Sequence, residues 1–149
     1  MSTVTPVEAD TFWEADGPDP AAVVAAVRTR YPSLSVTGFA LVNSLRFDPA
    51  RQAADREAMT GARAIEEFHA ALAFLSAAAS HHLARPAPGR TTDTWRRLAS
   101  RWVGVEISNG MFICAALALG WKVSPIRDAP TGTINLAATA RSVAEARRP

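Results

Sequence analysis

The sequence predicts a mainly α fold, with α+β as the alternative, in which four to five helices surround one buried helix at about residues 109–119. Three observations predict it. Asp-Pro pairs, which favour helix starts, occur at residues 19–20 and 48–49. Apolar residues recur at three-and-four spacing over residues 65–79, as on one face of a helix. Residues 111–119 are apolar on every side, which is typical of a helix in the core.

The chain begins with a segment that differs from the rest in charge. Residues 1–27 carry five acids and no base, whereas residues 28–149 carry 16 bases and nine acids. Residues 1–18 also lack any periodicity and contain Pro6, so we expect a flexible acidic arm there. The first helix then starts with Asp19 as its N-cap and ends at about Arg30.

The middle of the chain is predicted to be mostly helical. Residues 35–45 fit either a strand or an irregular connection, since Gly38 interrupts any long helix. The second Asp-Pro pair opens a helical region that extends to about Leu83, with a weak point at Thr60 and Gly61. Pro86, Pro88 and Gly89 then predict a loop.

The last third of the chain contains two further helices and a hairpin. Thr92 or Asp93 is expected to cap the first helix, and Ser108 or Asn109 the central one, which ends at Gly120. A terminal β-hairpin of residues 122–126 and 133–136 follows. We therefore expect one globular domain over residues 19–140 and a basic tail over residues 141–149.

Composition excludes several classes of protein. A chain of 149 residues with 48% hydrophobic residues is expected to bury a core. Its longest apolar run, from Gly110 to Val123, is shorter than the ~20 residues that cross a bilayer. The N-terminus resembles no secretory signal, so cytoplasmic residence and no membrane contact are expected. The single cysteine, Cys114, is predicted to be a buried apolar side chain.

A cluster of arginines is the first candidate binding site. Five of them occur within seventeen residues, namely Arg85, Arg90, Arg96, Arg97 and Arg101. Guanidinium groups at this density bind phosphates or an acidic protein surface. The alternative is a solvated basic face, paired in part with the acidic arm.

The start of the central helix is the second candidate site. Ser108, Asn109 and Gly110 put a capping side chain, an amide and an unhindered backbone at a helix N-terminus, where anions bind well. The alternative is simple capping of the helix by Ser108 or Asn109.

Catalytic and metal signatures are incomplete. Glu66 and His69 have the Glu-x-x-His spacing of carboxylate-bridged metal sites, but no second copy follows. An enzyme would have to assemble Glu66, His69, His81 or Glu106 in one cleft with Ser108 or Asn109. We therefore expect no catalytic residues, no metal and no cofactor, with a small enzyme as an alternative.

Residues 91–136 resemble a family of small uncharacterised bacterial proteins of plasmids and other mobile elements. The shared pattern is an aromatic helix, Ile/Val-Ser-Asn-Gly, an apolar Ala-Ala helix and Leu-Gly-aromatic, here at Trp102, Ile107–Gly110, Ile113, Ala115–Ala116 and Leu119–Trp121, with Asn135 in the hairpin. This chain has Glu106 and Ile107 where other members carry an aromatic residue before the turn. The resemblance implies an accessory protein of a mobile element and brings no activity with it. The expected function is to bind a protein partner, such as a host-defence component, with nucleic acid as the alternative.

Overall fold

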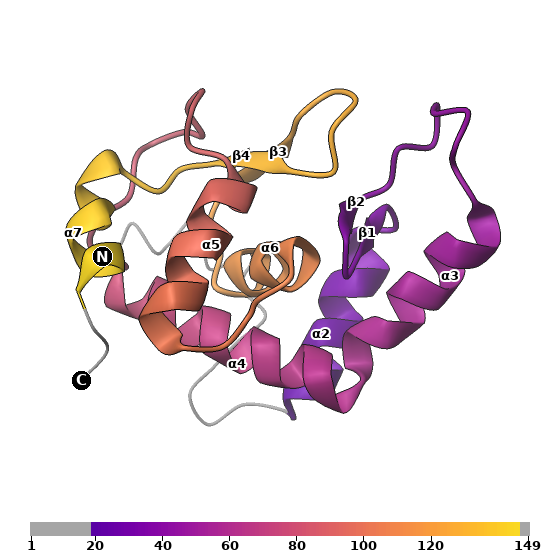
Figure 1. Ribbon diagram of the computed structural model, residues 1–149, viewed down its shortest axis with the longest axis horizontal. Coiled ribbons are helices and arrows are strands. Elements are labelled where there is room, and N and C mark those ends of the chain that lie inside the picture. Colours follow the sequence, from indigo (N-terminus) through magenta and orange to yellow (C-terminus); the bar gives the residue numbers. More distant parts are fainter. Residues whose placement is uncertain (1–18, 147–149) are drawn as a thin grey trace.

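The computed structural model describes residues 19–146. The fold is mainly α with a small β part, as predicted (Figure 1). Its helices are α2 (Pro20–Arg30), α3 (Pro49–Glu57), α4 (Ala62–Ala77), α5 (Thr92–Val103), α6 (Asn109–Ala118) and α7 (Arg141–Glu145), with 3₁₀ turns at Ala58–Thr60 and Ala138–Ala140. Two short hairpins complete it, β1 (Leu34–Ser35) with β2 (Gly38–Phe39), and β3 (Val123–Pro125) with β4 (Gly132–Ile134).

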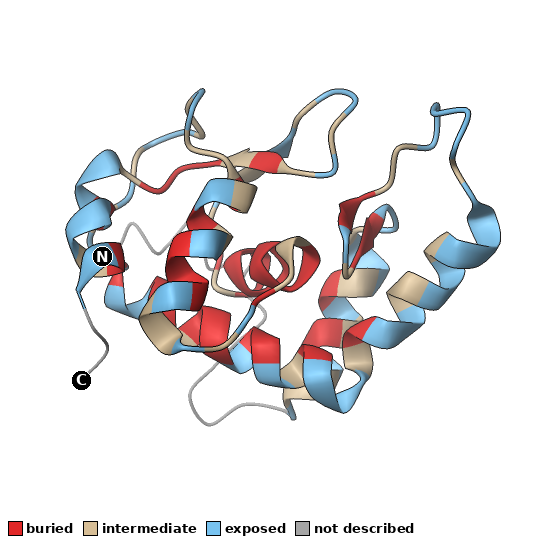
Figure 2. Cartoon of the chain, in the orientation of Figure 1, coloured by how far each residue is buried: buried red, intermediate tan, exposed pale blue. Residues whose placement is uncertain are grey.

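Helix α6 is the centre of the fold. It packs against α2, α4 and α5 and against strands of both hairpins. In Figure 1 it is seen nearly end-on among these elements, and in Figure 2 it is buried along almost its whole length. Every residue from Gly110 to Ala118 is buried. The prediction of a buried central helix is therefore confirmed.

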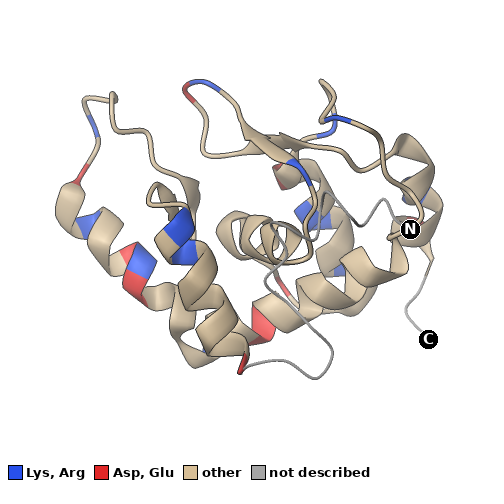
Figure 3. Ribbon diagram, turned by 180° about the vertical axis from the view of Figure 1, so that it is seen from behind, with Lys and Arg blue, Asp and Glu red and all other residues tan. Residues whose placement is uncertain are grey.

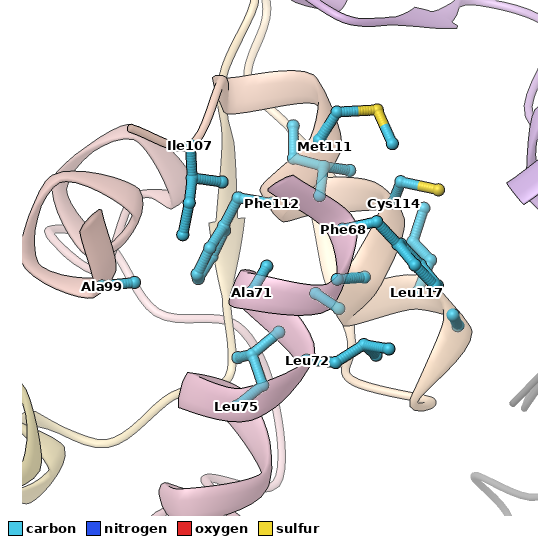
Figure 4. Close-up of a cluster of buried hydrophobic side chains, with 14 of the residues drawn as sticks. Phe68, Ala71, Leu72, Leu75, Ala99, Ile107, Met111, Phe112, Cys114 and Leu117 are labelled. Carbon is cyan, nitrogen blue, oxygen red and sulfur yellow. The ribbon is translucent and has the colours of Figure 1, made fainter. Parts of the chain in front are cut away.

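The core is the layer between α6 and the helices around it. Phe68 and Leu75 of α4 lie next to Phe112 and other apolar side chains of α6 (Figure 4), and all three of these side chains are fully buried. Small residues such as Ala71 and Ala99 face the same cluster and let the helices approach closely. Burial of a large apolar side chain stabilises a fold by about 1.5–3 kcal/mol, so this cluster is the main source of stability.

The helix starts follow the local signals in the sequence. Asp19 is the N-cap residue of α2, although its side chain makes no capping hydrogen bond. The carboxylate of Asp48 accepts hydrogen bonds from the backbone N–H groups of Ala50 and Arg51 at 3.0 and 3.2 Å. The prediction of Thr92 or Asp93 as the cap of α5 is wrong: the Thr91 side chain accepts from the Thr94 N–H and caps the helix, while Thr92 is buried and belongs to its first turn.

The connection after α2 is a hairpin. The sequence left residues 35–45 open between a strand and an irregular connection, and the structure pairs Leu34 with Phe39 and Ser35 with Gly38. The left-handed φ of +119° at Gly38 allows the tight turn. The C-terminal hairpin was predicted; β3 lies within the expected segment 122–126, whereas β4 begins at Gly132, one residue before the expected segment 133–136.

Helix α4 ends at Ala77, earlier than the predicted Leu83. The residues beyond it bond instead to the C-terminal segment. The Leu83 N–H donates to the Asn135 carbonyl at 2.6 Å, and the His81 carbonyl accepts from the Ala137 N–H at 2.7 Å. These hydrogen bonds to distant residues pair the backbone N–H and carbonyl groups that a longer α4 would otherwise pair within the helix. Tertiary contacts therefore decide where α4 ends.

Asn135 joins three segments and is 5% exposed. Its Oδ1 accepts from the Lys122 N–H at 2.9 Å, and its Nδ2 donates to the Leu83 carbonyl at 2.9 Å. The side chain therefore links the start of β3, the end of β4 and the segment after α4. This gives the asparagine a structural role.

We expect Asn135→Ala to lower the free energy of unfolding by about 2–3 kcal/mol, because it leaves a partly buried donor and acceptor without partners. Urea denaturation followed by circular dichroism measures the change. The matched control is Asn43→Ala, since Asn43 is exposed in the loop before α3. Equal stability of the two variants would contradict the structural role of Asn135.

Both predicted terminal segments extend beyond the described residues. The acidic arm at 1–18 lies outside them, as do residues 147–149 of the predicted basic tail. The described part of that tail forms α7, which packs against α5 and buries Ala144. Residues 141–145 are therefore packed on the rest of the described chain.

Candidate functional site

Two of the five predicted arginines are held by one carboxylate. Asp93, in the first turn of α5, has its Oδ1 2.8 Å from the Nε of Arg96 and its Oδ2 2.8 Å from an Nη of Arg97. Glu106 lies 3.1 Å from the other end of Arg96. The Arg96 side chain is 21% exposed and that of Arg97 is 67% exposed. Arg96 is thus enclosed by acids, whereas Arg97 still presents its guanidinium to solvent.

The other three arginines have no carboxylate partner among residues 19–146. Arg85 is exposed in the loop before α5, and Arg101 is exposed in the last turn of α5. Arg90 is half-buried, and its Nε is buried without a hydrogen-bond partner in the described chain. We call Arg85, Arg90, Arg97 and Arg101 the arginine surface.

Basic residues are not confined to α5. They also lie on α2, on α3 and in the loops along one edge of the molecule (Figure 3). One of them is used by the fold itself: the guanidinium of Arg56 donates to the carbonyls of Arg28, Tyr31 and Leu34 at 2.8–3.2 Å. Desolvation by burial and then the charge of Arg28 lower the pKa of Arg56. Arg56 therefore satisfies carbonyls at the end of α2 and has a structural role.

The Ser-Asn-Gly turn is bonded within the protein. The Oγ of Ser108 accepts from the Met111 N–H at 3.3 Å, which makes Ser108 the cap of α6, one of the two residues predicted for it. The Ser108 N–H donates to the Glu67 carboxylate at 2.7 Å, and the Gly110 N–H donates to the Val36 carbonyl at 3.0 Å. The backbone donors of Ser108, Gly110 and Met111 are therefore already engaged.

Asn109 connects both hairpins to the helices. Its Oδ1 accepts from the Thr92 hydroxyl at 3.0 Å, and its Nδ2 donates to the Pro130 carbonyl at 3.0 Å. The Thr92 hydroxyl oxygen in turn accepts from the Gly132 N–H at 3.1 Å. The side-chain amide of Asn109, predicted as a candidate ligand group, thus holds the β3–β4 loop against the starts of α5 and α6.

Sequence reasoning missed the main role of Glu67. It pairs with Arg63 at 3.4 Å, as a spacing of four residues on a helix favours, but its bond to Ser108 was not expected. A signal existed, because Glu67 lies three residues after Ala64 and four before Ala71 and so shares the buried side of α4. A carboxylate on an apolar stripe indicates a specific buried partner.

The groups that an enzyme would need are exposed or bonded to other residues within residues 19–146. Glu66 and His69 are exposed on α4, and the Nδ1 of His81 lies 3.1 Å from the hydroxyl of Thr139. Glu106 is paired with Arg96. Among the described residues none of these four side chains has a hydrogen bond to Ser108 or Asn109. In the same part of the chain no three metal-ligating side chains come together.

Two tryptophans of α5 pack on α4. Trp95 is 4% exposed, and Trp102 is half-buried with its ring edge-on to Phe74 at 5.8 Å between centroids. Trp95 is thus a core residue, in agreement with its helical spacing. Helices α5 and α6 follow each other after a short turn, as in a helix-turn-helix, but α6 is buried and cannot enter a DNA groove.

Comparison of the chain with known protein families, with curated proteins and with solved structures finds no match. Within residues 19–146, no helix combines the length and the apolar character that crossing a membrane requires.

Proposed function

We propose that this chain is an accessory protein without catalytic activity that binds an acidic protein partner through the arginine surface. The observation that supports this is that some of the arginines are paired with carboxylates and others are not. Arg96 is neutralised by Asp93 and Glu106, while Arg85 and Arg101 are exposed with no carboxylate partner in the described chain. Exposed guanidinium groups are suited to bidentate contacts with the carboxylates of a partner.

A protein partner suits this surface better than nucleic acid does. Asp93 and Glu106 lie among the arginines and interrupt the basic surface. Separate carboxylates of a protein can be placed to avoid these two acids, whereas the regular, continuous charge of a phosphate backbone cannot. The net charge of the whole chain is only +2, whereas nucleic-acid binding depends on an extended basic footprint. The resemblance to proteins of mobile elements supports an inhibitor of host defence or a regulator as the biological role.

The proposal is tested by charge reversal in the full chain. Arg85, Arg97 and Arg101 are changed together to glutamate, and Arg90 is left in place because its buried Nε makes its replacement a risk to folding. Partners are captured from an extract of the native host, with and without nuclease, and quantified by mass spectrometry. We expect a nuclease-resistant protein to be lost at least roughly tenfold from the variant, as expected when charge pairs at an interface become repulsive.

The matched control reverses three exposed arginines elsewhere, as R46E/R51E/R127E. It carries the same change in net charge and should keep the partner. Capture that is equal for both triple variants and the unmodified chain would refute the arginine surface. Loss of the captured partner on nuclease treatment would favour the nucleic-acid alternative.

A further inference from the structure

The outer side of α5 presents cations next to an aromatic ring. Arg97 and Arg101 are one helical turn apart and both are exposed. Trp102 follows Arg101 directly and is half-buried against Phe74 of α4. Acids along a peptide, with an aromatic residue between them, would complement this combination in both charge and apolar character.

Such a peptide occurs in the chain itself. In residues 8–16, the pair Phe12–Trp13 is flanked by four acids, which are Glu8, Asp10, Glu14 and Asp16. The same segment contains no lysine, arginine or histidine. Its charge is therefore opposite to that of Arg97 and Arg101, and its aromatic pair lies in the middle of the acidic run.

The length of the arm allows the contact. The described chain starts at Asp19, the N-cap of α2. An extended chain advances about 3.3 Å per residue, so Trp13 can lie about 20 Å from Asp19. A globular domain of this size has a radius of gyration of roughly 14 Å. The length of the arm is thus comparable with the radius of the domain, and the arm can extend over much of its surface.

We propose that residues 8–16 bind along the outer side of α5, with their carboxylates on Arg97 and Arg101 and the Phe12–Trp13 pair against Trp102. The arm then covers part of the arginine surface and competes with an external acidic partner. Only this competition rests on the proposed function, since the contact itself is measured in the isolated chain.

The test uses ¹⁹F NMR on the full chain labelled with 5-fluorotryptophan. Four tryptophans give four signals, and the Trp13 signal is assigned with Trp13→Phe. We expect the Trp13 signal of the unmodified chain to differ from its position in denatured protein and to show a reduced H₂O/D₂O isotope shift. In R97E/R101E it should move to the denatured position, with roughly a tenfold fall in the docked-to-free ratio.

Matched variants make the result specific. R46E/R127E has the same change in charge at two other exposed arginines and should leave the Trp13 signal in place. E14R/D16R combined with R97E/R101E restores opposite charges and should return the docked signal. The signals of Trp95 and Trp121, which take no part in the proposed contact, report in the same spectra whether the domain is folded, and R97A/R101A replaces R97E/R101E if they change.

A Trp13 signal at the denatured position in the unmodified chain would overturn the proposal, as would a docked signal unaffected by R97E/R101E. A docked signal that grows with protein concentration would also overturn it, because the arm would then bind a second copy. Failure to capture any partner from the host extract would count against the proposed function and leave this NMR result unchanged.

Discussion

Replacing Gly110 by alanine is expected to lower the free energy of unfolding by about 4 kcal/mol or more, which is exceptional for a single substitution. A Cβ on Gly110 would lie 1.7 Å from the Ser35 carbonyl oxygen and 2.5 Å from the Val36 carbonyl carbon. Both atoms are backbone, so no side-chain rotation relieves the clash. Either α6 or the β1–β2 hairpin must shift, and a shift breaks the Gly110–Val36 hydrogen bond.

The effect is measured by urea denaturation and by thermal unfolding followed by circular dichroism, with an expected fall in Tm of roughly 10–20 °C. Gly61→Ala is the matched control. A Cβ on Gly61 meets only the Ala58 carbonyl, at 3.3 Å, and the φ of −71° suits alanine, so its stability should change by less than about 1 kcal/mol. A Gly110→Ala protein as stable as this control would refute the close approach.

The Ser-Asn-Gly turn shows where sequence reasoning stops. Capping of α6 by Ser108 was predicted, because a cap depends on residues next to each other in the chain. The need for glycine at position 110 depends on Ser35, which lies far away in sequence. No local pattern carries that information. The same limit applies to Asn109, whose partners Thr92 and Pro130 belong to other elements.

The fold class was predictable for a related reason. Two Asp-Pro starts, an apolar stripe on α4 and the apolar segment of α6 are local or periodic signals, and each produced the expected element. The end of α4 was not predictable, since the residues after Ala77 pair with the C-terminal segment. Local propensity favours continued helix there, and a distant strand segment overrides it.

The sequence predicted which arginines make up the candidate site, but it did not predict which of them are neutralised by acids in the fold. The spacing of Arg97 and Arg101 on one helix follows from the sequence. Which arginines are neutralised depends on where acids lie in space, and Glu106 reaches Arg96 from beyond the end of α5. The arginine surface is therefore smaller than the predicted cluster of five, and the structure identifies which of its members are exposed.

Cys114 is expected to react with thiol reagents at least about a thousand times more slowly in the folded protein than in denaturant. The side chain is fully buried in the middle of α6. Modification therefore requires unfolding, and a domain with ~5 kcal/mol of stability is unfolded in roughly one molecule in several thousand. The rate of reaction with 5,5′-dithiobis(2-nitrobenzoate) measures this. In Ala53→Cys, the thiol introduced on the exposed side of α3 should react at once in the same sample.

The same burial predicts a pH dependence of stability. Desolvation raises the pKa of the Cys114 thiol well above its usual range, and the charge of Arg28 offsets this only in part. Below the pKa of the unfolded thiol, about 8.5, both states keep the proton. As the pH rises above it, only the thiol of the unfolded chain ionises, so Cys114 should lower the free energy of unfolding by up to about 1.4 kcal/mol per pH unit.

Urea denaturation of the unmodified chain and of Cys114→Ala between neutral and alkaline pH isolates this contribution. Parallel pH profiles, or prompt modification of Cys114 without denaturant, would show that the thiol is accessible and that α6 is not the closed centre of the fold.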